Sequence, residues 1–146
     1  MEKQNKTKIL LVDDDEMIRI YFRDVFWIHG GDDKYEVEMA TSLKEAEKKV
    51  YDEETRPDII FQDVMLPIKG EDNSPDEQVN RTLAFIKKIK EDKSLEKLKV
   101  IIFSSQNEKI IRDEVAKLGV DGYLVKGELM PKEILEFTDK INESNN

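Results

Sequence analysis

Short runs of consecutive apolar residues alternate with longer stretches of helical periodicity, and this alternation constrains the fold more than any other feature of the sequence. A continuous apolar run of strand length is typical of a parallel strand, because helices cover both faces of a parallel sheet. A run of alternating apolar and polar residues is instead typical of an edge strand with one face less covered. The continuous runs are residues 8–12, 59–61, 99–103 and 123–125, and the alternating run is 35–39.

Apolar residues spaced three and four apart predict one helix after each strand. Ser42 with Glu45, and Ser74 with Glu77, match the capping box, in which each side chain accepts a hydrogen bond from the other residue's backbone N–H. Strands that alternate with helices predict an α/β fold, with a parallel sheet between two layers of helices. The expected helices are residues 16–28, 43–50, 75 to about 92, 111–118 and 131–141.

Reactive side chains follow four of the predicted strands. Asp13 and Asp14 follow the first, Asp63 the third, Ser104 the fourth and Lys126 the fifth. Sites in parallel α/β sheets form at the carboxyl ends of the strands, so we expect these side chains to lie together. Three neighbouring carboxylates need a counter-charge, and Mg²⁺, which prefers carboxylate, water and phosphate oxygens, would supply it. The added hydroxyl and ammonium favour a metal-bound phosphoryl group as the ligand.

Each acidic residue taken alone has a simpler interpretation. A carboxylate that ends a buried strand, such as Asp63, can simply meet water. The acidic triplet can cap the following helix and interact with the positive end of its dipole. Helix capping explains Asp15 and Glu16 well, but Asp13 and Asp14 less well.

Composition limits the classes of partner. The 146 residues are enough for one domain, and a formal net charge of -9 disfavours nucleic acid and anionic membrane as direct partners. The absence of Cys excludes thiolate sites, and a single histidine, His29, cannot form a multi-histidine metal site. The polar start and the lack of an apolar run of bilayer length predict a cytoplasmic protein.

Four motifs surround the predicted strand ends. They are Ile-Leu-Leu-Val-Asp-Asp-Asp at 9–15, Pro-Asp-Ile-Ile-Phe-Gln-Asp-Val-Met-Leu-Pro at 57–67, Val-Ile-Ile-Phe-Ser-Ser at 100–105 and Gly-Tyr-Leu-Val-Lys at 122–126. Each is weak alone, but together and in this order they resemble the CheY-like receiver domains of two-component response regulators, from about Lys6 to Asn142. The resemblance implies a five-stranded parallel sheet of order 2-1-3-4-5. It also implies one receiver domain over residues 6–143, without a separate output domain.

The resemblance implies a role for each residue at the strand ends. Asp63 would accept a phosphoryl group from a phosphohistidine of a histidine kinase or phosphotransfer protein. The hydroxyl of Ser104 would hydrogen-bond the phosphoryl group, and Lys126 would pair with it. Phosphorylation and dephosphorylation would be self-catalysed, so the chain would be a phospho-acceptor rather than an enzyme. The implied Mg²⁺ ligands are Asp13, Asp14, Asp63 and the main-chain carbonyl of Met65.

Signal output also follows from the resemblance. Tyr123 would be the aromatic switch residue, which turns inward when the Ser104 hydroxyl moves towards the phosphoryl group. From the residues alone, a half-buried strand aromatic is the simpler interpretation of Tyr123. The downstream target protein would bind the face formed by the last two helices and the last strand.

Three positions depart from the family pattern. Gly127 occupies the place where the family usually has Pro, often after a cis bond, which costs about 3–4 kcal/mol without proline. Ser105 replaces a small residue, often Ala, after the hydroxyl position. The connection from Gly70 to Val79 is longer and more acidic than the usual short turn, so we expect partner docking beside the site to differ.

Two other functions use the same residues differently. An aspartate-nucleophile phosphatase of the haloacid dehalogenase type would carry a second Asp two residues after the nucleophile, where this chain has Met65. A degenerate receiver would act as a protein-docking module without phosphorylation. Because every expected site residue is present, phosphorylation is the favoured interpretation.

Overall fold

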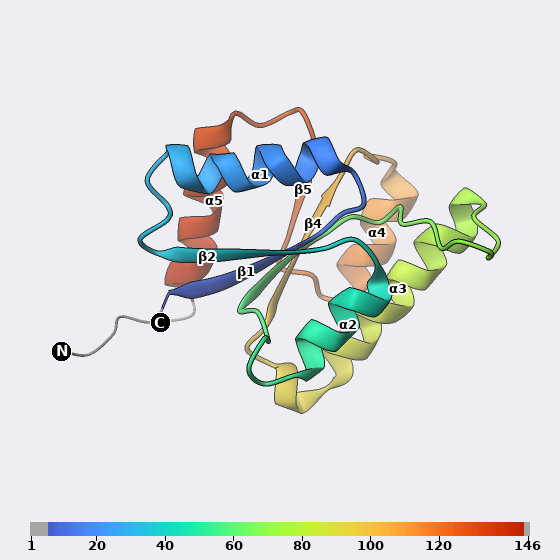
Figure 1. The fold of residues 1–146 in the computed structure, drawn as a ribbon. Helices are drawn as coiled ribbons and strands as arrows, with labels where there is room; N and C mark the ends of the chain where they lie inside the picture. The colour runs from blue at the N-terminus through green and yellow to red at the C-terminus, as the bar shows by residue number, and fades with distance from the viewer. Residues whose placement is uncertain (1–5, 145–146) are drawn as a thin grey trace.

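Five parallel strands in the order β2-β1-β3-β4-β5 form the centre of the computed structural model, which describes residues 6–144 (Figure 1). The parallel pairing and the strand order confirm the predicted α/β fold. Strand β2 lies at the edge and has exposed Glu36 and Glu38 between more buried residues, as the alternating run predicted. The strands are β1 (Thr7–Val12), β2 (Tyr35–Ala40), β3 (Ile59–Gln62), β4 (Lys99–Ser104) and β5 (Gly122–Val125).

Helices cover both faces of the sheet. Helices α1 (Glu16–Ile28) and α5 (Pro131–Glu143) lie on one face, and α2 (Leu43–Tyr51), α3 (Pro75–Glu91) and α4 (Lys109–Lys117) lie on the other (Figure 1). Successive strand residues point to opposite faces, so the strands divide the core into two clusters. The cluster under α1 is aromatic, with the Phe22 ring centroid 4.9 Å from that of Phe61 and 5.7 Å from that of Phe103.

Ser42 and Ser74 cap their helices as predicted, but the reciprocal half of each capping box is wrong. Ser42 Oγ accepts a hydrogen bond from the Glu45 backbone N–H at 3.1 Å. The Glu45 carboxylate accepts instead from the backbone N–H and the hydroxyl of Thr41, which together offer two donors. The Ser74 backbone N–H donates to Asp72 Oδ1 at 2.9 Å, because an Asp two residues earlier can form an Asx turn.

A short 3₁₀ helix at Lys93–Leu95 was not predicted. Asp92 caps it by accepting a hydrogen bond from the Ser94 backbone N–H at 2.9 Å, and Leu95 is buried. One turn of helix contains too few residues to produce a periodic pattern, so the sequence carried no clear signal for it.

The strand register brings four strand ends to one edge of the sheet. The Asp63 backbone N–H donates to the Val12 carbonyl at 3.0 Å, so Asp63 follows β3 beside the end of β1. The Lys126 backbone N–H donates to the Ser104 carbonyl at 2.9 Å, so β4 and β5 also end together. The side chains that follow these strands therefore share one edge.

No helix within residues 6–144 is long and apolar enough to cross a membrane. The polar residues 1–5, on which the expectation of a cytoplasmic protein partly depends, lie outside the described residues.

Candidate functional site

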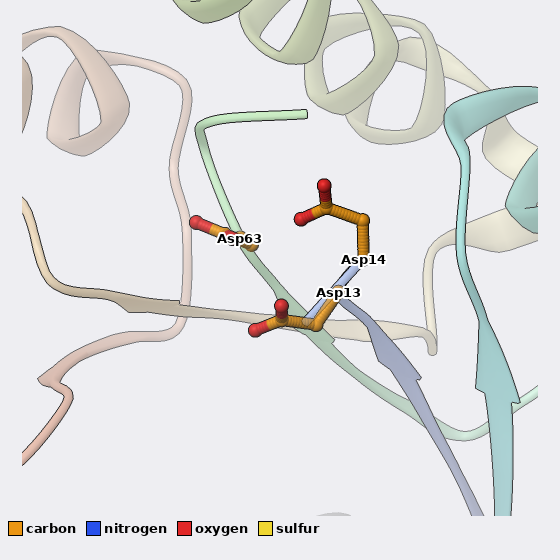
Figure 2. Close-up of side chains that lie close together, drawn as sticks. All are labelled: Asp13, Asp14 and Asp63. Carbon is orange, nitrogen blue, oxygen red and sulfur yellow. The ribbon is translucent and has the colours of Figure 1, made fainter. Parts of the chain in front are cut away.

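Three carboxylates meet at the carboxyl end of the sheet (Figure 2). One oxygen from each of Asp13, Asp14 and Asp63 lies within 4.8 Å of the others. Asp13 and Asp63 are only 0% and 6% exposed, whereas Asp14 is exposed to solvent. The structure thus brings together the three acidic residues that the sequence placed after β1 and β3.

Lys126 lies between the two buried carboxylates. Its Nζ is 2.6 Å from Asp13 Oδ2, in an ion pair without hydrogen-bond geometry, and it donates a hydrogen bond to Asp63 Oδ2 at 3.1 Å. The Lys126 side chain is only 13% exposed, and its Nζ is 5.8 Å from the ring centroid of Phe103. One ammonium therefore faces two carboxylates in a largely dry environment.

Backbone N–H groups fix the other oxygens of the buried carboxylates. Asp13 Oδ1 accepts from the Asp15 N–H at 2.9 Å, and Asp63 Oδ1 accepts from the Met65 N–H at 3.2 Å. These short local turns hold both carboxylates in one orientation. The oxygens that face Lys126 are the Oδ2 atoms of the two residues.

The site is electrostatically unbalanced. Burial raises the pKa of Asp63 from 3.8 to about 6, against the lowering effect of Lys126 and with a further rise from Asp13. Burial also lowers the pKa of Lys126, but Asp63 and Asp13 more than offset this, so its pKa is raised overall. Burial therefore destabilises the ionised form of Asp63 near neutral pH, and a further cation beside the carboxylate would stabilise that form.

Ser104 and Tyr123 both contact the loop between β4 and α4. The fully buried Ser104 accepts a hydrogen bond at Oγ from the Gln106 backbone N–H at 3.1 Å. The Tyr123 hydroxyl donates to the main-chain carbonyl of Gln106. Tyr123 is half-buried and packs against the core cluster on the α4 side, in agreement with the simpler interpretation of a strand aromatic. Its role as a switch stays a prediction.

The long acidic segment after β3 is held in place by three side chains, those of Asn73, Arg81 and Gln78. Asn73 Oδ1 accepts from the Ile68 N–H at 2.8 Å, and Asn73 Nδ2 donates to the Ile68 carbonyl at 2.9 Å. From α3, Arg81 donates to Asn73 Oδ1 at 2.8 Å and to the Asp72 carbonyl at 2.7 Å. Gln78 adds a hydrogen bond to the Asn73 carbonyl at 2.7 Å. The segment is thus an ordered rim beside the site.

Asn73→Ala is expected to lower the free energy of unfolding by about 1–2 kcal/mol, because the change removes hydrogen bonds to Ile68 and Arg81. Glu71→Gln, two residues away, is expected to leave stability unchanged, since no hydrogen bond or ion pair of the Glu71 side chain occurs within residues 6–144. Urea denaturation of both variants measures the difference. Equal stability of the two variants would contradict the role of Asn73.

The sequence of residues 9–138 matches the family model described as "Response regulator receiver domain". The chain belongs to the response regulator receiver domain family. This membership assigns the receiver domain to two-component signal transduction. No curated protein sequence matches this receiver domain significantly.

Solved structures of response regulators share the fold of this receiver domain. The chemotaxis protein CheY4 of Vibrio cholerae is 23% identical, with a TM-score of 0.71 over 94% of this chain and 99% of that chain. The phosphorylated cyanobacterial phytochrome response regulator RcpA is 21% identical, with a TM-score of 0.71 over 95% and 93% of the two chains. The Mn²⁺-bound form of response regulator Rcp1 is 19% identical, with a TM-score of 0.68 over 92% and 91%. The CheY-like fold is therefore confirmed despite low sequence identity.

The receiver domain departs from the family pattern directly after Lys126. No cis peptide bond occurs within residues 6–144, so the bond to Gly127 is trans. Gly127 has φ +85°, a left-handed conformation that glycine adopts without a steric penalty. The loop beside Lys126 therefore turns by means of a glycine instead of a cis-proline. Ser105, the other substituted position, is exposed.

Three residues that organise the surroundings of the site were not predicted. Asn73 and Arg81 hold the rim, and Arg112 of α4 lies over the ring of Tyr123. A polar loop residue or an Arg on a helix surface is usually solvated, so residue type alone gave no signal. The long connection after β3 was the only sequence feature that pointed to unusual structure there.

Proposed function

We propose that this receiver domain is a response regulator that accepts a phosphoryl group on Asp63 and signals by phosphorylation-dependent protein binding. The observation that carries the proposal is the pair of buried carboxylates, Asp63 and Asp13, with the ammonium of Lys126 between them. The phosphoryl donor is a phosphohistidine on a histidine kinase or a phosphotransfer protein. Membership of the receiver family and the phosphorylated state of RcpA, which has the same fold, support this reaction.

Asp63 acts as a carboxylate nucleophile. Its Oδ1 is bound by the Met65 N–H, which leaves Oδ2, next to Lys126 Nζ, as the attacking oxygen. Oδ2 attacks the phosphorus atom, the bond between phosphorus and the histidine nitrogen breaks, and the imidazole leaves. Lys126 then pairs with the phosphoryl oxygens, and the Ser104 hydroxyl donates a hydrogen bond to them. Water later attacks phosphorus, the bond between phosphorus and Asp63 Oδ2 breaks, and inorganic phosphate leaves, which restores the carboxylate.

The acidic cluster fits a divalent cation. Asp13 and Asp63 are buried, and within residues 6–144 Lys126 is the one ammonium that pairs with them. Exposed Asp14 adds a third carboxylate. The Met65 main-chain carbonyl accepts no hydrogen bond from residues 6–144, so it is available as a fourth ligand. Mg²⁺ bound by these groups would neutralise charge on the transferring phosphoryl group. The Mn²⁺-bound form of Rcp1 supports a divalent cation in this fold.

The receiver domain passes its signal on by binding a partner protein. The receiver unit spans residues 6–143, and its target binds the face formed by α4, β5 and α5 in the cytoplasm. Two large apolar side chains near this face are exposed, Ile110 at 75% and Met130 at 67%, and they offer apolar area to a partner. Tyr123 of β5 belongs to this face and is connected to the Ser104 hydroxyl through Gln106, so its position would report phosphorylation to the target.

Incubation with acetyl phosphate tests the proposal. We expect intact-protein mass spectrometry to show a gain of one phosphoryl group that depends on Mg²⁺, and peptide mapping to locate it on Asp63. A cation-independent gain, or a gain on another residue, would contradict the proposed site. No gain under either condition would favour the docking module that works without phosphorylation.

A further inference from the structure

Three contacts hold Tyr123 in its half-buried position. Its hydroxyl donates to the Gln106 carbonyl, and its ring packs against the core cluster on the α4 side. The guanidinium carbon of Arg112 lies over the ring, 4.8 Å from the centroid. Burial raises the pKa of the Tyr123 phenol, which agrees with a ring that is partly removed from water.

Arg112 is anchored, unlike the other cations of α4. Its Nη1 donates to Asn107 Oδ1 at 2.5 Å, so the guanidinium is held between the β4–α4 loop and the ring of Tyr123. Among the described residues, Lys109 and Lys117 each pair only with a carboxylate on the same helix, at 3.3 Å and 3.4 Å. The placement of Arg112 is therefore particular to this side chain and not a general property of the helix surface.

The same loop joins Tyr123 to the phosphorylation site. The Gln106 N–H donates to Ser104 Oγ, and the Gln106 carbonyl accepts from the Tyr123 hydroxyl. One residue thus connects the hydroxyl that would contact the phosphoryl group with the aromatic ring under Arg112. A movement of Ser104 towards Asp63 would be transmitted to Tyr123 through this backbone segment.

We infer that Arg112 is a positioning residue that biases Tyr123 towards the half-buried position before any phosphoryl transfer, by its cation–π contact with the ring. The inference rests on the proposed function, in which Asp63 is phosphorylated and Ser104 binds the phosphoryl group. Arg112 thus favours the half-buried position of Tyr123 in the unphosphorylated protein, and phosphorylation moves the same equilibrium further towards this position.

The expected bias is modest. A cation–π contact with an exposed guanidinium changes the ratio of half-buried to exposed Tyr123 roughly two- to fivefold. Phosphorylation acts on the same equilibrium. Without the guanidinium, a larger fraction of the molecules should have Tyr123 exposed before phosphorylation. The shift of Tyr123 to the half-buried position on phosphorylation should therefore be larger in the variant than in the wild type.

Fluorine NMR of the full chain labelled with fluorotyrosine tests the inference, with Tyr123→Phe to assign the signal. In Arg112→Met, which keeps side-chain length without the charge, we expect the Tyr123 signal to move towards the position of a solvated tyrosine by the stated two- to fivefold change in ratio. Addition of acetyl phosphate and Mg²⁺ should move it back. Arg112→Lys should restore part of the wild-type position, because it keeps a cation but loses the planar donor fork to Asn107.

Lys117→Met is the matched control, since it removes a cation from the same helix without touching Tyr123. An unchanged Tyr123 signal in Arg112→Met, or an equal shift in Lys117→Met, would overturn the role of Arg112. Intact mass is measured on the same samples. Absence of the phosphoryl gain would refute the proposed function, whereas the comparison made before the donor is added decides the role of Arg112 on its own.

Discussion

Asp63→Asn is expected to take up no phosphoryl group and to be more stable than the wild type in metal-free solution. The amide lacks the anionic oxygen that attacks phosphorus. The stability increase follows from the pKa of Asp63, which burial and Asp13 raise from 3.8 to about 6. A shift of this size corresponds to about 3 kcal/mol near neutral pH, and we expect about 1–3 kcal/mol because the amide of the variant interacts more weakly with Lys126 than the carboxylate does.

The pH dependence gives the sign of this effect. A carboxyl group with a raised pKa in the folded state binds its proton more tightly there than in the unfolded chain. Its contribution to wild-type stability is therefore fully present below about pH 4 and is lost as the pH rises to about 6. The variant has no such titration, so its stability advantage should appear across this interval and stay constant above it.

Urea denaturation of both proteins over this pH range, with a chelator present, measures the difference. Asp58→Asn is the matched control, because it makes the same chemical change at the other end of β3, where Asp58 is exposed and accepts a hydrogen bond from the Lys8 N–H. Equal stability of Asp63→Asn and the wild type near neutral pH would show that the buried carboxylate carries no electrostatic cost. Retained phosphorylation would remove Asp63 from the proposed role.

The sheet was predictable because its strands have a simple sequence signature. Continuous apolar runs became β1, β3 and β4, whose residues alternate between two buried faces, and the alternating run became edge strand β2. Once the strands are parallel, their carboxyl ends must share one edge. The meeting of Asp13, Asp63 and Lys126 therefore followed from chain order and needed no knowledge of side-chain contacts.

Contacts between elements that are distant in the sequence were not predictable in the same way. The stacking of Arg112 on Tyr123 depends on how α4 packs beside β5, and no local sequence pattern specifies that packing. The pairing of Asn73 with Ile68 depends on the path of an irregular segment. The reciprocal half of each capping box was wrong for a related reason, since Thr41 and Asp72 supplied competing partners one or two residues away.

Lys126→Met is expected to lower the free energy of unfolding by about 3–5 kcal/mol in metal-free solution, because it leaves two buried carboxylates without their counter-charge. The loss should be smaller at acidic pH, where Asp63 takes up a proton and no longer needs a counter-charge. Lys87→Met removes a cation whose side chain is 63% exposed and which pairs with Glu91 at 3.9 Å, and it should cost about 0–1 kcal/mol. A similar small loss for Lys126→Met would contradict the electrostatic account.

Mg²⁺ distinguishes lost charge from lost packing in Lys126→Met. A ligand that binds only the folded state stabilises it in proportion to the logarithm of its concentration over its dissociation constant. In the wild type, Lys126 already occupies the space between Asp13 and Asp63 and repels a second cation. Without this ammonium the affinity for Mg²⁺ should rise, so saturating Mg²⁺ should stabilise the variant more than the wild type. An equal increase in the two proteins would mean that Lys126 and the cation do not share these carboxylates, and would count against the proposed metal ligands.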